Sequence, residues 1–504
     1  MIRSAVRRCL IFFSFSALAA AQTAEQRTAR YLDSVRNQPS RLLAFLHDMP
    51  KGGDLHTHLD GAIYAEDLID FAANDNFCVD RTTSRLMGAP CDSCDHYTPK
   101  PAVRCAYDDH ILYNQIIDAW SMRNWRPGDE SGHDHFFATF DKFGLASHNH
   151  AAEGIATVIN RAAREHVQYI EFMHTADGRA AAEVGMRLGW DSDFAKMREK
   201  LLAGGLKEII AATSKSLAEA DTRARTELKC GTSDAEPGCG VTVRYLYQVL
   251  RGLPQAAVFA QIVLGFELAS ADPRFVGLNL VMPEDWYVPI HDFNQHMAML
   301  DYLHGVYPKV HISLHAGEIA MGLVKPEDLS FHIRASVERG HAERIGHGVD
   351  VMLERDPIGL MKEMAARNVM VEINLTSNDQ ILGVSGDDHP LPVYMKYGVP
   401  VAISTDDEGV ARSDMTHEYL RAVEGYRLSY NQLKRLTRQS LEHSFLPGQS
   451  LWASTKESFR PVTACASDLS GKPTHACSEF LAANERAREQ MRLESEFTNF
   501  EKRY

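Results

Sequence analysis

Short apolar runs alternate with longer amphipathic segments along most of this chain. The runs that predict strands occupy eight segments, namely 53–58, 167–173, 241–248, 275–281, 310–315, 343–347, 369–374 and 400–405. Between most of them, apolar residues recur at helical spacing, over 150–165, 194–219, 291–306, 326–338 and 355–367. Strands that alternate with helices favour a parallel sheet, and eight of them predict an α/β fold of the (β/α)8 TIM barrel type.

Three other parts of the chain depart from this alternation. Residues 22–50 have apolar residues at helical spacing and predict an N-terminal helical extension. Two insertions are expected, a polar and cysteine-rich one over 76–132 and a Gly/Ser/Pro/Asp cluster over 220–240. Since no internal repeat or clear linker is present, residues 51–504 are expected to form one barrel domain with a mostly helical C-terminal part.

Residues 1–21 have the pattern of a secretory signal peptide. Arg3, Arg7 and Arg8 precede an apolar run that ends in three alanines before residue 22. This run is about twelve residues long, too short to span a bilayer. The alternative is the frayed apolar N-terminus of a cytosolic protein. We expect an exported protein, periplasmic or extracellular, with no membrane span in its mature form.

The cysteines support export. Of nine in the chain, Cys9 lies in the signal segment, and the others fall in three polar groups: Cys78, Cys91, Cys94, Cys105, Cys230, Cys239, Cys465 and Cys477. An even number of grouped cysteines in an exported chain predicts disulfides. Proximity favours the pairs Cys230–Cys239 and Cys465–Cys477. A redox or zinc pair at Cys91-x-x-Cys94 is the alternative.

Composition and charge narrow the class of ligand. The hydrophobic fraction of 45% and the charged fraction of 24% are ordinary for a soluble globular protein. The formal net charge of −14 argues against a protein that binds the nucleic-acid backbone, which needs a basic face. A single nucleoside, which has no phosphate, stays compatible with this charge.

Histidines and one glutamate follow two of the predicted strands. His56 and His58 end the first strand, and residues two apart in a strand face the same side, so both imidazoles can reach one metal. His315 ends the fifth strand and adds a third nitrogen, while Glu318 lies where the chain leaves that strand and can carry a proton. The alternatives are ordinary core or surface histidines and a helix-start carboxylate.

Two further strand ends carry candidate chemistry. His347 lies between Gly346 and Gly348, which leave room around an imidazole. Asp406 and Asp407 end the last strand, where one carboxylate can bind a metal and its neighbour can meet a substrate. A glycine-rich turn and a helix cap are the alternatives.

In a (β/α)8 barrel the carboxyl ends of the strands converge on one face. Three imidazole nitrogens and one carboxylate from these ends suit a divalent ion such as zinc and leave a position for water.

Four motifs, in this order, resemble those of the adenosine deaminase and AMP deaminase family. They are Leu55–Ala62, Leu314–Glu318, Arg344–Gly348 and Ser404–Asp407. The order and spacing hold from about residue 50 to about residue 425. The signal segment, the long N-terminal part and the cysteines resemble most the secreted, growth-factor-related branch of that family.

The resemblance implies a role for each motif residue. The ligands of one Zn²⁺ per chain would be His56, His58, His315 and Asp406. The other roles would be protonation of purine N1 by Glu318, activation of water by His347, contact with N7 by Asp407 and a hydrogen bond to the ribose from Asp60. Hydroxide would attack C6, and ammonia would leave. The implied partner is a small purine nucleoside, adenosine or 2′-deoxyadenosine, and a homodimer is left open.

The chain departs from the family pattern where the substrate would bind. Met282 stands where we expect a glycine that packs against the purine, and Glu408 stands where the family has proline. The metal and proton-transfer residues keep the pattern. Deamination is therefore expected, while the substrate stays open to another purine derivative. A catalytically weak, growth-factor-like binding protein is the alternative of another class.

Overall fold

Eight parallel strands form the centre of the molecule. The computed structural model describes residues 22–504 apart from 96, 129, 457 and 470–471. The strand order is β1-β4-β5-β6-β7-β8-β9-β10. Their bounds are β1 Gly52–His58, β4 Val167–His174, β5 Thr242–Leu250, β6 Phe275–Val281, β7 His311–Ala316, β8 Arg344–His347, β9 Met370–Ile373 and β10 Val401–Ile403. Each strand overlaps a predicted segment, and the predicted (β/α)8 TIM barrel is confirmed.

The first and last strands meet at their carboxyl ends. Thr57 of β1 forms a parallel bridge with Asp406, just beyond β10. The backbone N–H of Asp406 donates to the His56 carbonyl at 2.8 Å, and the N–H of His58 donates to the Asp406 carbonyl at 3.3 Å. These bonds join the two ends of the sheet at residues predicted to bind the metal.

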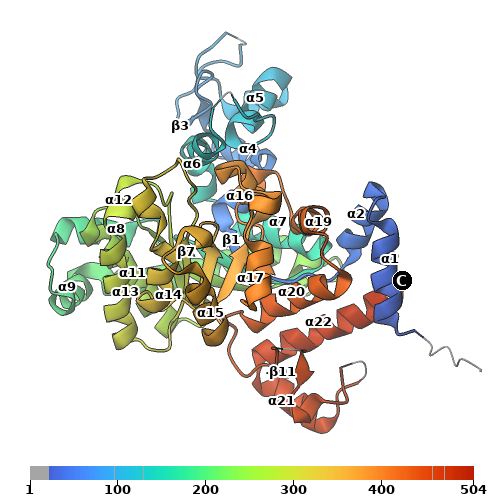
Figure 1. Ribbon diagram of the computed structural model, residues 1–504. Coiled ribbons are helices and arrows are strands. Elements are labelled where there is room, and N and C mark those ends of the chain that lie inside the picture. The colour runs from blue at the N-terminus through green and yellow to red at the C-terminus, as the bar shows by residue number, and fades with distance from the viewer. Residues whose placement is uncertain (1–21, 96, 129, 457, 470–471) are drawn as a thin grey trace, which may run out of the picture.

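Helices surround the strands, as Figure 1 shows. They include α7 Ala151–Arg164, α8 Ala180–Leu188, α11 Gln255–Ala271, α13 Phe293–Val306, α14 His332–Glu338, α15 Pro357–Arg367, α17 Leu391–Tyr397, α19 Met415–Tyr426 and α20 Tyr430–Glu442. The helix predicted over 194–219 is two helices, α9 Phe194–Leu201 and α10 Lys207–Glu227. The break is a short π-helical segment in which Gly205 has a φ of 120°, a conformation that glycine adopts without steric cost.

The N-terminal helices α1 Ala24–Val35 and α2 Pro39–Asp48 lie beside the C-terminal helix α22 Glu485–Glu501 (Figure 1). A buried lysine, Lys51, links α2 to the barrel. Its ammonium donates to the carbonyl oxygens of Leu46 at 2.7 Å and Glu165 at 2.8 Å. The helical extension is therefore bonded directly to the entrance of β1.

A lobe projects from one end of the barrel (Figure 1). It contains β2 Cys78–Val79, β3 Leu86–Met87 and α5 His110–Trp120, which stand over α4 Ala65–Asn74 and α6 Gly132–His148. Disulfides Cys78–Cys91 and Cys94–Cys105 crosslink the lobe. Because Cys91 and Cys94 are bonded to different partners, the alternative of a Cys-x-x-Cys redox or zinc pair is wrong.

The two disulfide pairs predicted from proximity are confirmed. Cys230–Cys239 closes the turn after α10, and Cys465–Cys477 joins a short 3₁₀ turn to α21 His475–Ala483. Four disulfides fit an oxidising compartment. The predicted signal peptide, 1–21, lies outside the described residues. Among the helices that the structure describes, none combines the length and the apolar character needed to cross a membrane.

Candidate metal centre

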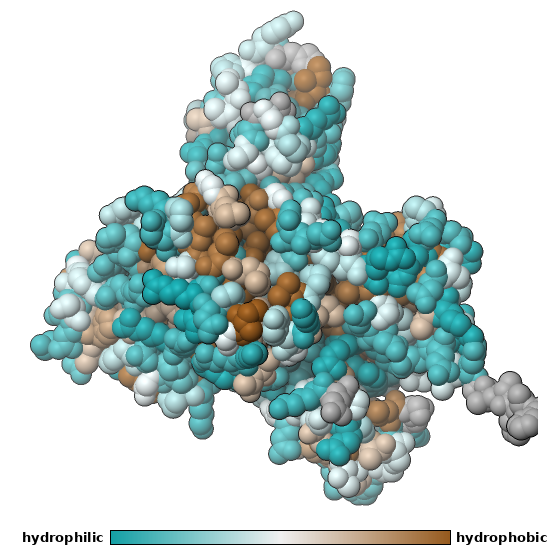
Figure 2. Space-filling view, in the orientation of Figure 1, coloured by the Kyte–Doolittle hydropathy of each residue, from teal (hydrophilic) through white to brown (hydrophobic). Residues whose placement is uncertain are grey.

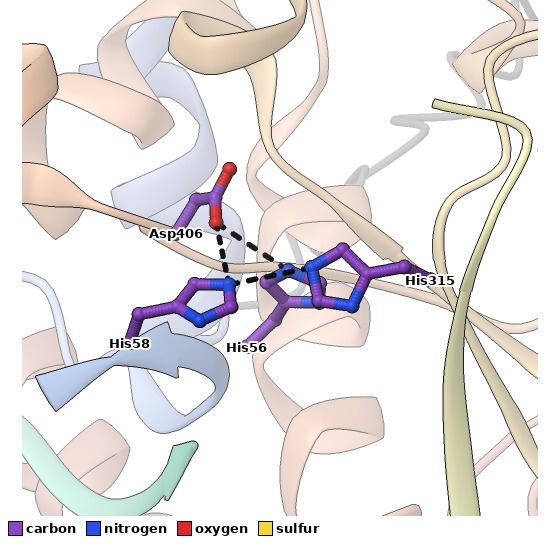
Figure 3. Close-up of side chains that lie close together, drawn as sticks. All are labelled: His56, His58, His315 and Asp406. Carbon is purple, nitrogen blue, oxygen red and sulfur yellow. Dashed lines mark hydrogen bonds and ion pairs between the residues drawn. The ribbon is translucent and has the colours of Figure 1, made fainter. Parts of the chain in front are cut away.

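Three imidazoles and one carboxylate converge at the carboxyl ends of the strands (Figure 3). His56 and His58 come from β1, His315 from β7 and Asp406 from the turn after β10, and one ligand atom of each lies within 4.8 Å of the others. The Nε2 atoms of His58 and His315 are 3.3 Å apart, and both His56 and His58 direct Nε2 at Asp406 Oδ1, at 3.5 and 3.3 Å. All four residues are buried or nearly so, and the structure brings the whole predicted ligand set together.

The opposite nitrogen of each imidazole faces an oxygen. The Nδ1 contacts are His56 with Glu372 Oε2 at 2.6 Å, His58 with Gln248 Oε1 at 2.8 Å and His315 with Asn279 Oδ1 at 2.8 Å. An acceptor at Nδ1 holds the proton there and leaves the Nε2 lone pair free for a metal. The Nε2 atom of His56 is buried without a hydrogen-bond partner in the described chain. This donor set fits zinc.

Backbone geometry at the site depends on glycine and on unusual dihedral angles. Asp406 has a φ of 60° and His347 a φ of 67°, a region that non-glycine residues seldom occupy. A Cβ atom added at Gly346 would lie 2.5 Å from Cε1 of His56, and one added at Gly61 would lie 1.7 Å from Oδ1 of Asp407. Both glycines therefore leave space that site side chains occupy.

Glu318 and His347 lie beside the four-residue group. His347 Nε2 is 3.6 Å from Glu318 Oε1 and 3.9 Å from Asp406 Oδ2, while His347 Nδ1 contacts Asn378 Oδ1 at 2.9 Å. Burial raises the pKa of Glu318 to about 8, and the carboxylates of Asp406 and Glu284 act in the same direction. This raised pKa favours the protonated form of Glu318 near neutral pH. It starts no helix, so the alternative of a helix-start carboxylate is wrong.

Asp407 and Asp60 lie next to the ligands. Asp407 is buried, its Oδ1 has no hydrogen-bond partner among the described residues, and it caps no N–H of the short helix α18 Glu408–Ala411. Burial raises the pKa of Asp407 to about 8. Asp60, in α3 Leu59–Ala62, lies two residues after His58. The roles assigned to these residues from the sequence stay predictions.

Met282 keeps a conformation typical of glycine. Its φ is 94°, its Sδ lies 3.3 Å from the N–H of Gly252, and its carbonyl oxygen accepts two hydrogen bonds from Arg251. The thioether therefore turns toward Gly252. Its predicted effect on purine packing stays a prediction.

The residues that orient the candidate ligands are not apparent from the motifs. Glu372 of β9 also contacts the guanidinium of Arg344 at 2.7 Å, and Arg344 contacts Glu171 of β4 at 2.6 Å, all three fully buried. The available signal is a charged or amide residue inside a strand buried on both faces, where apolar residues are the rule.

Part of this chain is similar in sequence to known proteins. Residues 211–453 match the family described as adenosine deaminase. The adenosine deaminase of Escherichia coli (strain SE11) is 39% identical over 140 residues, which are 28% of this chain and 39% of that protein. The aligned segment thus spans well under two thirds of that relative.

Two solved structures share the fold. The N6-methyl-AMP deaminase from Arabidopsis thaliana has a TM-score of 0.51 at 19% identity, covering 80% of this chain and 94% of that one. Arabidopsis ADAL complexed with IMP has a TM-score of 0.52 at 19% identity, covering 79% and 93%.

Proposed function

We propose that this chain, whose residues 211–453 match the adenosine deaminase family, is a zinc-dependent hydrolase that deaminates adenosine and 2′-deoxyadenosine. One observation carries the proposal. Three imidazole nitrogens and one carboxylate converge beside Glu318, a buried carboxyl group whose pKa burial raises to about 8, which favours its protonated form near neutral pH. Metal-dependent hydrolytic deamination of a purine uses this combination of a metal site and an adjacent proton donor.

Different residues of the site would have different chemical roles. His56, His58, His315 and Asp406 would hold the zinc, which would lower the pKa of the attacking water toward neutrality. Glu318 donates its proton to a purine ring nitrogen, which makes the neighbouring carbon more electrophilic. His347, with Nδ1 held by Asn378, presents Nε2 toward Glu318 and Asp406 and can accept a proton from the attacking water. Burial of these groups excludes bulk water from the reaction.

The surface beyond β6 and β7 supports an uncharged nucleoside rather than a nucleotide. Exposed apolar side chains follow β6 and β7, namely Trp286, Tyr287 and Met321. Figure 2 shows an apolar surface where the projecting lobe meets the barrel near α12 Tyr287–His291. Such a surface favours a neutral ligand, and the net charge of −14 disfavours a phosphate.

A substrate screen tests the proposal. Purified protein lacking residues 1–21 is assayed for ammonia release from adenosine, 2′-deoxyadenosine, adenine and AMP. We expect turnover of the two nucleosides. Release from AMP or adenine alone would reassign the substrate to another purine derivative, and no release from any of the four would favour a binding protein without this activity.

A variant tests the mechanism. Glu318→Gln is expected to keep about one zinc per chain and to lose roughly 10²–10⁴-fold in kcat, because it lacks the proton. A fully active variant, or an active enzyme free of metal, would contradict the assignment.

We also propose export, with residues 1–21 as the signal peptide. The four disulfides support this proposal. Fractionation of cells that express the full chain should find the trimmed protein outside the cytoplasm.

A further inference from the structure

Glu318 lies in a segment whose direction is not set by a helix or a strand. The chain leaves β7 at Ala316 and turns at Gly317, which has a φ of 77°. A Cβ atom at Gly317 would lie 2.5 Å from Oδ1 of Asp350 and 2.9 Å from Cδ1 of Ile333. The aim of the Glu318 side chain therefore depends on what holds this tightly packed turn.

A second buried carboxylate, Glu284, holds the turn from one side. Glu284 Oε1 accepts the backbone N–H of Gly317 at 3.0 Å, and Oε2 accepts the N–H of Glu318 at 2.9 Å. Glu284 follows β6, and its side chain is fully buried. One carboxylate thus accepts hydrogen bonds from two consecutive backbone amides, much as a capping side chain does at the N-terminus of a helix.

A histidine and an arginine lie beside Glu284. His332 Nδ1 lies 2.7 Å from Oε1, and Arg251 Nη2 lies 3.9 Å from Oε2. Although burial opposes ionisation, His332, Arg251 and the bonded amide lower the pKa of Glu284 to about 2. Arg251 also donates to the carbonyl oxygen of His315 at 3.0 Å. The pair therefore fixes peptide groups on both sides of Ala316.

The other side of the turn is bonded to the segment that carries His347. The carbonyl of Ala316 accepts the N–H of Gly348 at 3.1 Å, and the carbonyl of Gly317 accepts the N–H of Val349 at 2.8 Å. Movement of the turn away from Glu284 would therefore change the relation of Glu318 to His347 as well.

We propose that Glu284 is a positioning residue that sets the aim of Glu318 by fixing the amides of Gly317 and Glu318. The inference rests on the proposed deamination, in which Glu318 delivers a proton to the purine ring. A displacement of about 1 Å at a catalytic group can lower a rate roughly 100-fold, so the loss should fall on kcat.

Glu354 provides a matched control. It is also a buried glutamate that accepts two consecutive backbone amides, those of Ile333 at 2.7 Å and Arg334 at 3.1 Å, but it serves α14 and not the turn of Glu318. Glu284 accepts one amide on each carboxylate oxygen, so Glu284→Gln turns an NH₂ group toward one of the two amides and should lower the melting temperature. Both amides at Glu354 donate to Oε1, so Glu354→Gln can keep both bonds on its amide oxygen. Only Glu284→Gln should lower kcat, by roughly 10–100-fold, with zinc content unchanged and KM within about threefold.

Hydrogen exchange provides a readout independent of activity. In the zinc-loaded Glu284→Gln protein, exchange over 315–320 should rise about tenfold, which corresponds to one lost hydrogen bond, while it stays unchanged in Glu354→Gln. If the parent protein releases no ammonia from any purine, the proposed function fails, but this exchange experiment still tests the contact. Protected amides in Glu284→Gln, or equal kcat per folded enzyme in both variants, would overturn the inference.

Should Glu284→Gln not fold, Glu284→Asp takes its place. This variant keeps the charge and moves the carboxylate back by one methylene. Its kcat should therefore also fall, but by less than in Glu284→Gln. Parent-like kcat together with parent-like exchange in Glu284→Asp would likewise overturn the inference.

Discussion

Replacing Glu372 with glutamine should disturb the contacts that link the candidate metal site to the barrel. Glu372 contacts the metal-ligand candidate His56 through Oε2 at 2.6 Å and Arg344 through Oε1 at 2.7 Å, and none of the three side chains is exposed. If the glutamine oxygen faces His56, its NH₂ opposes the guanidinium. If it faces Arg344, the NH₂ opposes His56 Nδ1 and favours the tautomer with the proton on Nε2, which cannot bind a metal.

The expected magnitudes follow from these contacts. Loss of the oxygen that orients a ligating histidine lowers metal affinity about 10–100-fold, or roughly 1.4–2.7 kcal/mol. Breaking a buried ion pair costs about 3–5 kcal/mol of unfolding free energy, and Glu171 still pairs with Arg344 at 2.6 Å, so we expect about 3 kcal/mol.

Two assays check the Glu372→Gln prediction. Competition with a chromophoric chelator measures the zinc affinity of metal-stripped protein, and urea unfolding measures stability. Glu343→Gln is the control, because Glu343 pairs with His311 at 2.8 Å but is half exposed, and its loss should change stability by less than about 0.5 kcal/mol. Zinc affinity within twofold of the parent in Glu372→Gln would refute the argument that this carboxylate orients His56.

Three further predictions concern other parts of the molecule. Gly61→Ala should displace Asp407, whose Oδ1 lies 1.7 Å from the added carbon, and should lower kcat/KM at unchanged zinc content, as kinetics and metal analysis will show. The double variant Cys465→Ser, Cys477→Ser should lose about 2–3 kcal/mol in urea unfolding, since it opens a loop that spans a sequence separation of 12. Burial raises the pKa of Glu418 to about 7 from 4.5, so the stability that its proton contributes is fully present below pH 4.5 and is lost as the pH rises through 7. Glu418→Gln should flatten the stability profile between pH 5 and 8 by about 2–3 kcal/mol, and a profile as steep as the parent's would contradict this.

The strands could be predicted because barrel strands are buried on both faces and stand out as apolar runs. The ligand candidates could be found because each ends such a run, and barrel topology brings those ends together. Glu372 shows where this reasoning stops. A glutamate inside an apolar strand signals a buried partner, but whether that partner is His56, Arg344 or both depends on which strands are neighbours and which way each side chain points.

The hydrophobic pattern also could not predict local backbone conformation. Helical periodicity over 194–219 gave no sign of the break at Gly205, because apolar spacing does not register one left-handed glycine. At Met282 the sequence indicated a misfit between a large side chain and a position suited to glycine. The structure shows a φ of 94°, in the region that favours glycine, and a side chain directed toward Gly252, neither of which residue type alone could indicate.

The bridge between Thr57 and Asp406 has a consequence for the order of assembly. The first two candidate metal ligands are translated early, and the fourth comes hundreds of residues later, just after the strand that completes the ring. A nascent or partly folded chain therefore holds only a fraction of the ligands and binds metal weakly. Tight metal binding should therefore require that the first and last strands of the barrel have already come together. Metal shortage should slow the last step of maturation rather than the first.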